Sequence, residues 1–227
     1  MKHKSEITLA VLSTVLVLLF IIGRITNALD YYSMKTPTNY PGIGEGDLVF
    51  ASNLKEPQRF DFIAYRAETP EFGKGTWIHR ICGVEGDTIE IKDGTLYVNH
   101  QDADKALNLA HTYQLTKTEL AHLKKMGDID EMFDPEMFED SIYTNVSDQL
   151  IKDHAVKATR YYFQKENADD MISKTFGEPW NIDHFGPVIV PKDAWFVLGD
   201  NRSNSMDSRF RGFIEKSKYV ATVLGKK

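Results

Sequence analysis

The sequence has a single cysteine, no excess of basic charge, and no repeated or low-complexity segment. The lone Cys82 excludes an intramolecular disulfide framework and a cysteine-rich zinc site. Lysine and arginine number 27 against 33 aspartates and glutamates, which gives a formal net charge of −6 and no basic surface of the kind that binds nucleic acid. The histidines show no ligand spacing with carboxylates or cysteine, so we infer no metal and no cofactor.

The sequence has one long apolar run, residues 7–23. About 17 residues make roughly 25 Å of helix, near the lower limit for a bilayer core. Lys2 and Lys4 precede the run and Arg24 follows it, which favours a cytoplasmic N-terminus. We predict that residues 1–24 are a retained single-pass anchor in the lipid of the inner cell membrane, with the rest on the periplasmic side. A cleaved secretory signal is the alternative, although no small-x-small exit follows the run.

Beyond residue 47 the sequence alternates apolar and polar residues in short runs, which is typical of β-strands. The candidate strands are DLVFASNL, FDFIAYR and GTWIHRICGV, then the hairpin DTIEIKDGTLYVN with its turn at Asp93 and Gly94, and finally FGPVIVPKDAWFVLGD and YVATVLG. Successive strands with tight connections predict an antiparallel, partly closed sheet. We therefore predict a mainly β domain built from residues 25–99 and 185–227.

Residues 100–184 are polar and partly helical in pattern. The stretch TKTELAHLKKMGDIDEMF predicts a helix that begins with a capping box formed by Thr116 and Glu119. A second stretch, SDQLIKDHAVKATRYYFQ, mixes the helical and the strand periods. We interpret this block as an α/β insertion packed on the sheet, not as an independent domain.

Three segments together resemble the type I signal peptidases of peptidase family S26, which are membrane-anchored serine endopeptidases. The segment YYSMKTPTNYPGIGEGDLVF looks like the family's Ser-Met-x-Pro-Thr stretch, which is followed by Gly-Asp. The segment IHRICGVEGDTIEI is similar to its Lys-Arg box, and LGDNRSNSMDSRFRG matches Gly-Asp-Asn-Arg-x-x-Ser-x-Asp-Ser-Arg. The resemblance covers the apolar run, the strands up to residue 99, and everything from residue 185.

The resemblance implies a mostly β catalytic domain outside the membrane that removes signal peptides from exported preproteins. It makes Ser33 the nucleophile, and His79 stands where the family has its base lysine. A serine hydroxyl needs a base that takes its proton as it attacks. Histidine, with a reference pKa of about 6.5, is largely neutral at pH 7 and can do this. The catalytic subunit of the endoplasmic-reticulum signal peptidase is similar, because it carries His-Arg at the place of His79 and Arg80.

A histidine base works best when a partner holds its other ring nitrogen. By the resemblance, Ser205 matches the serine that hydrogen-bonds the base, and Asp207 matches an aspartate that a Ser-His enzyme can recruit. We favour Asp207, because a carboxylate both orients an imidazole and stabilises the imidazolium. The family's Asp-Arg pairs brace the site, and the supporting residues implied here are Arg80, Asp200, Asn201 and Arg209.

Substrate contacts follow from the same resemblance. The backbone N–H of Ser33 is the natural donor to the oxyanion that forms during acyl transfer. The substrate would bind in extended form and add a strand to the sheet. Met34 and the two tyrosines before Ser33 are candidates for an apolar surface that contacts the substrate and the bilayer.

Some readings stay open at this point. The stretch SMKTPT has one residue more between Met and Pro than the family pattern, so Ser33 could be an ordinary loop serine and Ser52 the next candidate nucleophile. Lys74 could be a displaced base, although an exposed turn lysine stays protonated. The alternative function is a catalytically inactive envelope protein that binds signal sequences or a partner. For Cys82, a small buried hydrophobic side chain is a better reading than a reactive thiol.

Overall fold

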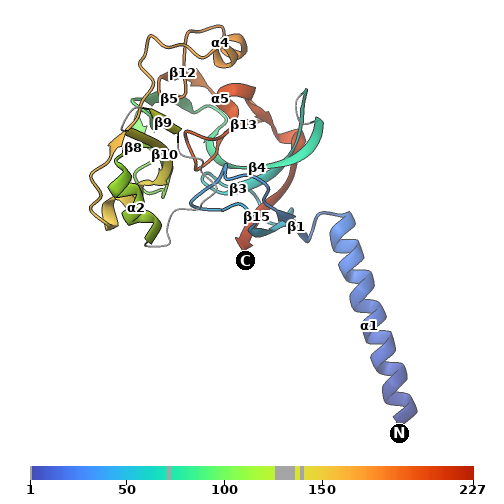
Figure 1. Cartoon of the computed structure of the whole chain (residues 1–227). Coiled ribbons are helices and arrows are strands. Elements are labelled where there is room, and N and C mark those ends of the chain that lie inside the picture. Colours follow the sequence, from blue (N-terminus) through green and yellow to red (C-terminus); the bar gives the residue numbers. More distant parts are fainter. Residues whose placement is uncertain (1, 71–72, 126–135, 139–140) are drawn as a thin grey trace.

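The computed structural model describes residues 2–70, 73–125, 136–138 and 141–227. The chain begins with helix α1 (Lys2–Ile25), which projects from a body made mainly of β-strands (Figure 1). Among the described residues, we find no helix with the length and apolar character needed to cross a membrane. The predicted membrane-spanning anchor is therefore not confirmed.

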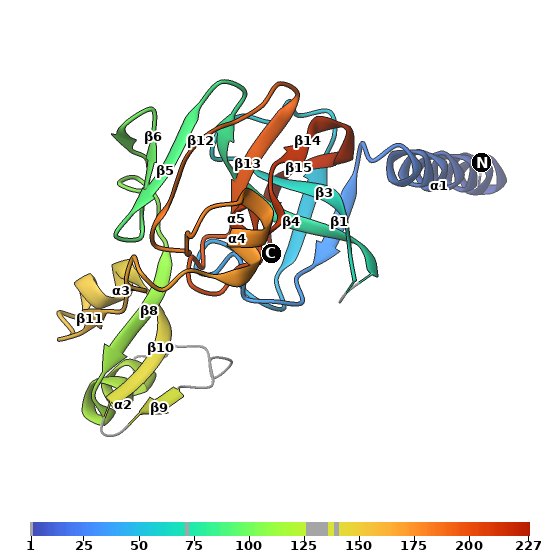
Figure 2. The same ribbon diagram turned by 90° about the horizontal axis from the view of Figure 1, so that it is seen from above.

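The largest sheet has seven strands in the order β1-β2-β15-β3-β4-β13-β14, and every neighbouring pair is antiparallel. Figure 2 shows its strands between α1 and the rest of the body. Each strand predicted from the alternation in this region is present. The bounds are β1 (Asp30–Ser33), β2 (Leu48–Ser52), β3 (Phe62–Thr69), β4 (Gly73–Val84), β13 (Ala194–Leu198), β14 (Ile214–Glu215) and β15 (Tyr219–Lys226).

A second antiparallel sheet has the order β12-β5-β6-β7. Its strands are β5 (Thr88–Lys92), β6 (Thr95–Val98), β7 (Gln101–Asp102) and β12 (Phe185–Ile189). Asp93 and Gly94 join β5 to β6 with φ of 47° and 67°, the left-handed values that a two-residue hairpin turn requires. The predicted hairpin is confirmed.

A third antiparallel sheet lies within residues 100–184, in the order β11-β8-β10-β9. Its strands are β8 (Ala110–Leu115), β9 (Glu136–Phe138), β10 (Ser141–Ser147) and β11 (Thr159–Arg160). The stretch with mixed periods divides into helix α3 (Asp148–Asp153) and β11. The α/β character holds, but the long strands β8 and β10 were not foreseen.

Helix α2 (Lys117–Lys125) begins with the predicted capping box. The Thr116 N–H donates to Glu119 Oε2 at 2.8 Å, and the Glu119 N–H donates to Thr116 Oγ1 at 3.2 Å. These bonds satisfy backbone donors that the first turn of a helix leaves open. The remainder of the predicted helical stretch, from residue 126 onward, falls mostly outside the described residues.

Helix α4 (Asp170–Phe176) packs on the second sheet, where Ile172 and Phe176 join a cluster that contains Ile89 and Phe196. Helix α5 (Ser208–Arg211) and a short 3₁₀ helix, η1 (Lys216–Lys218), follow β13 and precede the last strand, β15. The last part of the 100–184 block therefore shares a core with the flanking strands. The division of the chain into residues 25–99 and 185–227 against 100–184 stays a proposal.

Candidate active site

His79 lies on β4 with its ring buried, only 3% exposed. In the β3–β4 register His79 is opposite Ile63, and Tyr65 is two residues further along β3, on the same face of the sheet. The Tyr65 hydroxyl and His79 Nδ1 are 2.7 Å apart. The edge of Trp77 also approaches the ring, with centroids 6.1 Å apart. The local packing is aromatic and holds the imidazole in one orientation.

Burial lowers the pKa of His79 to about 4, a shift that the charge of Asp207 opposes and that of Arg209 reinforces. The ring is therefore neutral at pH 7, as a general base must be before it accepts a proton. Its Nε2 has no hydrogen-bond partner among the described residues. A buried, neutral imidazole with one unpaired nitrogen can accept a proton from a group brought next to it.

Asp207 caps the N-terminus of α5 and is fully buried. Its carboxylate accepts hydrogen bonds from Arg209 Nε at 2.9 Å, from Arg209 Nη2 at 2.8 Å, and from the Gly199 N–H at 3.2 Å. Burial alone would raise the pKa of Asp207, but the charge and hydrogen bonds of Arg209 outweigh it, so the pKa lies below its usual value. Asp207 is ionised, and its charge acts on His79 without a direct bond to the ring.

Ser205 is buried, and its Oγ has no hydrogen-bond partner among the described residues. We predicted that Asp207 or Ser205 would orient His79 by a hydrogen bond. In this structure neither does, and the partner of His79 Nδ1 is Tyr65. The physical reason is that both carboxylate oxygens of Asp207 are already engaged by Arg209 and Gly199. Other roles for Asp207 and Ser205 at the site stay proposals.

Ser33 is the last residue of β1 and is exposed. The segment after it crosses to the other two motifs: Asn39 Nδ2 donates to the Ile78 carbonyl at 2.7 Å, and the Asn201 N–H donates to the Thr38 carbonyl at 3.0 Å. The three motif segments are thus brought together in space. Because His79 Nε2 has no partner among the described residues, Ser33 does not donate to it in this structure.

Met34 is only 8% exposed and packs in a core cluster that includes Ile78, the neighbour of His79. The sequence suggested that Met34 belongs to an exposed apolar surface. Its burial shows that it does not. Tyr31, on the same strand as Ser33, is 48% exposed and takes that place. The burial of Met34 is useful in another way, because it fastens the backbone beside Ser33 to the strand that carries His79.

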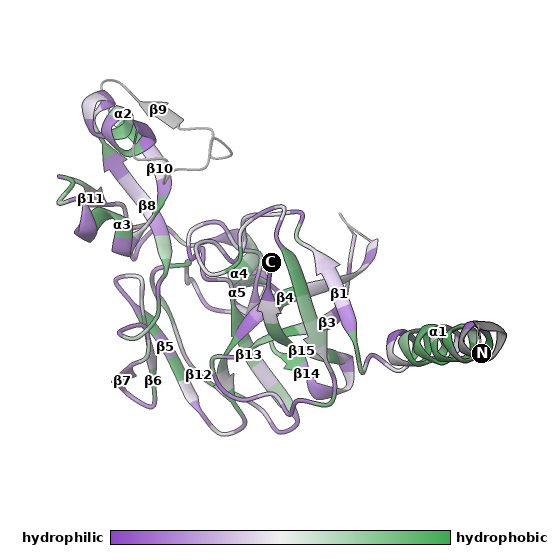
Figure 3. Cartoon of the chain, turned by 90° about the horizontal axis from the view of Figure 1, so that it is seen from below, coloured by the Kyte–Doolittle hydropathy of each residue, from purple (hydrophilic) through white to green (hydrophobic). Residues whose placement is uncertain are grey.

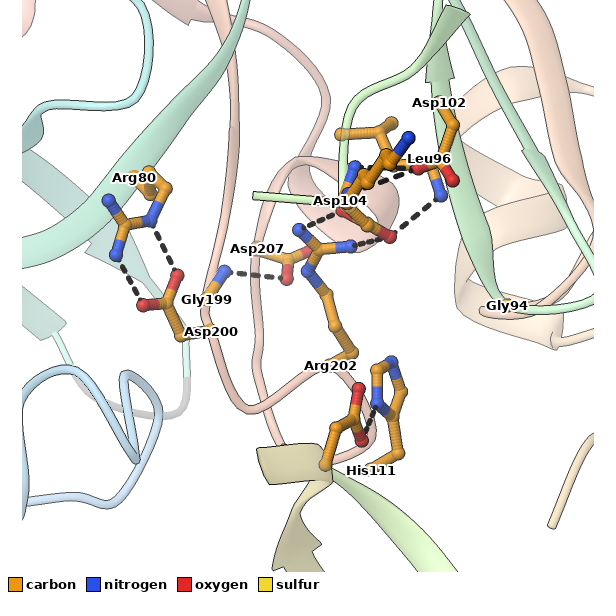
Figure 4. A network of polar contacts seen from close by, with 12 residues as sticks. Arg80, Gly94, Leu96, Asp102, Asp104, His111, Gly199, Asp200, Arg202 and Asp207 are labelled. Atoms are coloured by element: carbon orange, nitrogen blue, oxygen red, sulfur yellow. Dashed lines mark hydrogen bonds and ion pairs between the residues drawn. The ribbon is translucent and has the colours of Figure 1, made fainter. Parts of the chain in front are cut away.

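Two further ion pairs hold the loop that follows β13 (Figure 4). Arg80 Nε donates to Asp200 Oδ1 at 2.7 Å, and the Arg80 guanidinium stacks on the Phe62 ring at 4.0 Å. Arg202 contacts Asp104 from the other side of the loop at 2.8 Å. The loop with Ser205 and Asp207 is therefore anchored to β4 on one side and to the segment after β7 on the other.

The alternative nucleophile and the alternative base named from the sequence have other surroundings. Ser52 donates its hydroxyl hydrogen to the Ala28 carbonyl at 2.7 Å and is buried. The Lys74 side chain is 83% exposed and lies 4.0 Å from Glu68. Cys82 is fully buried, which confirms its reading as a small core residue. Among the parts of the chain that the structure describes, no group of three or more His, Cys, Asp and Glu side chains has the arrangement of a metal site.

Sequence reasoning missed Tyr65 and Arg202 as members of this site. Tyr65 lies outside the three motifs, and its proximity to His79 depends on the β3–β4 register, which a strand pattern does not determine. Arg202 stands inside the third motif, which marks it as a candidate member of the site. Its partner Asp104, in the segment after β7, belongs to none of the three motifs, so the sequence does not indicate the ion pair.

Comparisons with known proteins agree with the three motifs. The profile of a family described as "Signal peptidase, peptidase S26" matches residues 5–225. "Signal peptidase I" of Buchnera aphidicola subsp. Baizongia pistaciae is 25% identical over 242 residues, covering 96% of this chain and 74% of that protein. "Signal peptidase I T" of Bacillus subtilis is 26% identical over 196 residues, covering 84% and 69%. A solved signal peptidase I from Enterococcus faecalis is 24% identical, with a TM-score of 0.34, over 74% of this chain and 97% of that one.

Proposed function

Because this chain belongs to the signal peptidase family, peptidase S26, whose members remove signal peptides, we propose that it cleaves signal peptides from exported preproteins with Ser33 and His79. The observation that carries the proposal is the state of His79: a buried, neutral ring whose Nε2 is unpaired. Met34, which follows Ser33, and Ile78, which precedes His79, belong to one buried core cluster. These features support a serine and histidine pair that closes around a substrate.

In the proposed reaction, His79 Nε2 takes the hydroxyl proton of Ser33 while Oγ attacks the scissile carbonyl carbon. The backbone N–H of Ser33 stabilises the negative charge on the carbonyl oxygen. The tetrahedral intermediate collapses, the new amine leaves with the proton from His79, and an acyl-enzyme on Ser33 remains. Water then attacks the acyl carbon while His79 takes its proton, and the ester bond breaks as His79 returns the proton to Ser33 Oγ, which releases the new carboxylate. Catalytic hydrogen bonds are often long or poorly aligned before a substrate binds, so the proposal is compatible with a His79 Nε2 that has no partner among the described residues.

Asp207 assists through its charge. The imidazolium of His79 is costly to form in a buried site, as its low pKa reflects. The ionised Asp207 lowers that cost because its attraction acts only on the charged ring. Arg209 neutralises part of this effect but keeps Asp207 ionised and fixed.

The substrate would pair with β1, an edge strand of the seven-stranded sheet with one side open. Ser33 ends this strand, so an added strand would run past the nucleophile. Helix α1 lies apart from the body, and much of its ribbon is coloured as hydrophobic in Figure 3. Its leucine, valine and isoleucine side chains are exposed. We propose that these side chains contact lipid and keep the enzyme beside the membrane, where signal peptides reside.

The test is cleavage of a labelled preprotein by the full chain. Ser33→Ala and His79→Ala should each reduce the rate to background, whereas Ser52→Ala and Lys74→Ala, which remove the alternative nucleophile and base, should retain it. The wild-type rate should fall only as the pH approaches about 4, where the His79 ring becomes protonated. Retained activity in folded Ser33→Ala or His79→Ala protein would rule out this pair.

A second candidate function is a binding protein without hydrolysis. The observation in its favour is that Ser33 and His79 share no hydrogen bond in this structure. It would be supported if wild-type protein bound a fluorescent signal peptide with micromolar affinity and left it uncleaved during prolonged incubation. Binding by Ser33→Ala, with cleavage by wild type, supports the peptidase instead.

A further inference from the structure

Tyr65 and His79 form a buried pair that none of the three sequence motifs contains. The two residues are diagonal neighbours on β3 and β4, and their rings are 5.8 Å apart between centroids. Tyr65 is only 2% exposed, so the 2.7 Å contact between its hydroxyl and Nδ1 is shielded from water. Cross-strand pairs of this kind are held in place by the sheet itself.

The other polar groups near the ring are engaged elsewhere. Asp207 is bonded to Arg209 and to the Gly199 N–H. Ser205 Oγ has no bond at all among the residues described. The Tyr65 hydroxyl is therefore the group in place to bond Nδ1.

We propose that Tyr65 is a positioning residue: its hydroxyl oxygen accepts a hydrogen bond from Nδ1–H of His79, which leaves the Nε2 lone pair free to take the proton of Ser33. This inference rests on the proposed function, because it assigns the third member of the same site. Tyr65 thus occupies the place that a carboxylate holds in a Ser-His-Asp triad.

The proton transfer itself requires such an acceptor. Once Nε2 has taken the serine proton, both ring nitrogens carry hydrogens, and Nδ1–H must donate to something or remain unpaired in a buried site. The oxygen of Tyr65 already lies at hydrogen-bond distance. Burial raises the pKa of Tyr65, with the Asp207 charge adding to the effect, so the acceptor is a neutral hydroxyl at working pH.

The charges around the pair favour this direction of the bond. Asp207 acts on both Tyr65 and His79, and Arg209 acts on His79. The negative charge of Asp207 favours the hydroxyl dipole with its positive end toward the carboxylate and its oxygen toward Nδ1. This preference acts through charge alone, because Arg209 and Gly199 already engage the Asp207 oxygens. The neutral hydroxyl stabilises the imidazolium less than a direct carboxylate would, so the ring stays a weak base.

The first test reads the tautomer directly. ¹⁵N chemical shifts of labelled histidine, assigned with His79→Gln, should show His79 of the wild type with its hydrogen on Nδ1 at pH 7. In Tyr65→Phe, which keeps the aromatic ring and removes only the hydroxyl, the population with hydrogen on Nε2 should rise. A wild-type His79 with hydrogen on Nε2, or a tautomer unaltered by the substitution, would overturn the inference.

The second test is kinetic. Tyr65→Phe should lower kcat by about 10- to 100-fold, part of the total that general base catalysis contributes, and leave KM nearly unchanged. The matched control is Tyr113→Phe on β8 of the third sheet, which removes a hydroxyl that donates to Asp148 of helix α3 and should leave kcat unchanged. An unchanged kcat in folded Tyr65→Phe protein would contradict the inference.

The two tests separate failure of this inference from failure of the proposed function. If wild-type protein cleaves no preprotein, the proposed peptidase is wrong, and the ¹⁵N shifts still decide whether Tyr65 sets the tautomer. If wild type cleaves and Ser33→Ala does not, but Tyr65→Phe matches wild type in rate and tautomer, only the role of Tyr65 is wrong. Circular dichroism and thermal unfolding establish that each variant is folded.

Discussion

Arg209 and Asp207 form an ion pair sealed inside the protein, with Nε to Oδ1 at 2.9 Å and Nη2 to Oδ2 at 2.8 Å. Their side chains are 2% and 0% exposed. Arg209 also donates to the Arg202 carbonyl at 2.7 Å, so one guanidinium connects both parts of the same loop. A pair in this position controls the shape of the loop and places a negative charge near His79.

Removing one member of this pair should be strongly destabilising. Asp207→Ala leaves the Arg209 charge buried without its partner, and we expect the free energy of unfolding to fall by about 3–5 kcal/mol. Urea unfolding followed by fluorescence measures this. The double variant Asp207→Leu with Arg209→Met removes both charges, so it should recover most of the stability and still cleave more slowly. A loss below about 1 kcal/mol in Asp207→Ala would contradict the burial of the pair.

The stability of the protein should depend on pH through His79. Its pKa of about 4 in the folded state lies below the unfolded value of about 6.5, so the unfolded chain binds more protons between these limits. The free energy of unfolding should therefore fall as the pH falls from about 6.5 to about 4, by at most about 3 kcal/mol from this group. The pKa of His111 is also lowered by burial, and it acts in the same direction.

The variant His79→Gln separates the contribution of His79 to the pH dependence of stability from that of His111. Urea unfolding of wild type and variant at several pH values should give a shallower pH dependence for the variant. The same slope in both proteins would show that His79 is not buried in its neutral form.

The sequence predicted much of this architecture because its strands obey simple alternation. Strands β5 and β6 alternate buried and partly exposed residues, and the hairpin at Asp93 and Gly94 has the residues that its turn requires. Strands β8 and β10 were missed because polar side chains, His111 and Thr144, stand at buried positions among the apolar ones and interrupt the alternation that marks a strand. Composition alone suggested helix or irregular structure there.

The sequence motifs indicate which residues form the candidate site, but they do not indicate which of these residues contact one another. Arg80, Asp200, Asn201, Arg209, Ser205 and Asp207 come from motifs, and the structure places them around one loop. Which residue bonds the His79 ring depends on strand register and on the saturation of Asp207 by Arg209, and neither can be read from spacing. Tyr65 is therefore visible only in the folded protein.

Cys82 should be inert in the folded protein. It is fully buried between apolar neighbours, and burial raises the pKa of its thiol to about 12. Because the thiolate is the reactive form, iodoacetamide at pH 8 should leave the native protein unlabelled and label it fully in urea. Mass spectrometry of intact protein measures this. Rapid labelling of native protein would mean that the strand carrying His79 opens readily, because Cys82 lies on that strand.

Gly199 should tolerate no side chain. A Cβ atom there would come within 2.3 Å of Ser205 Oγ and 2.4 Å of the Thr38 carbonyl oxygen, and the second of these belongs to the backbone and cannot rotate away. Gly199→Ala should therefore separate the segment after Ser33 from the loop with Ser205 and Asp207, lowering stability by about 1–3 kcal/mol and cleavage by more than that loss explains. The control is Gly225→Ala, since no atom lies within 4 Å of a Cβ added there. Thermal unfolding and preprotein cleavage compare the two variants, and similar values would mean that close packing between these segments is not needed for activity.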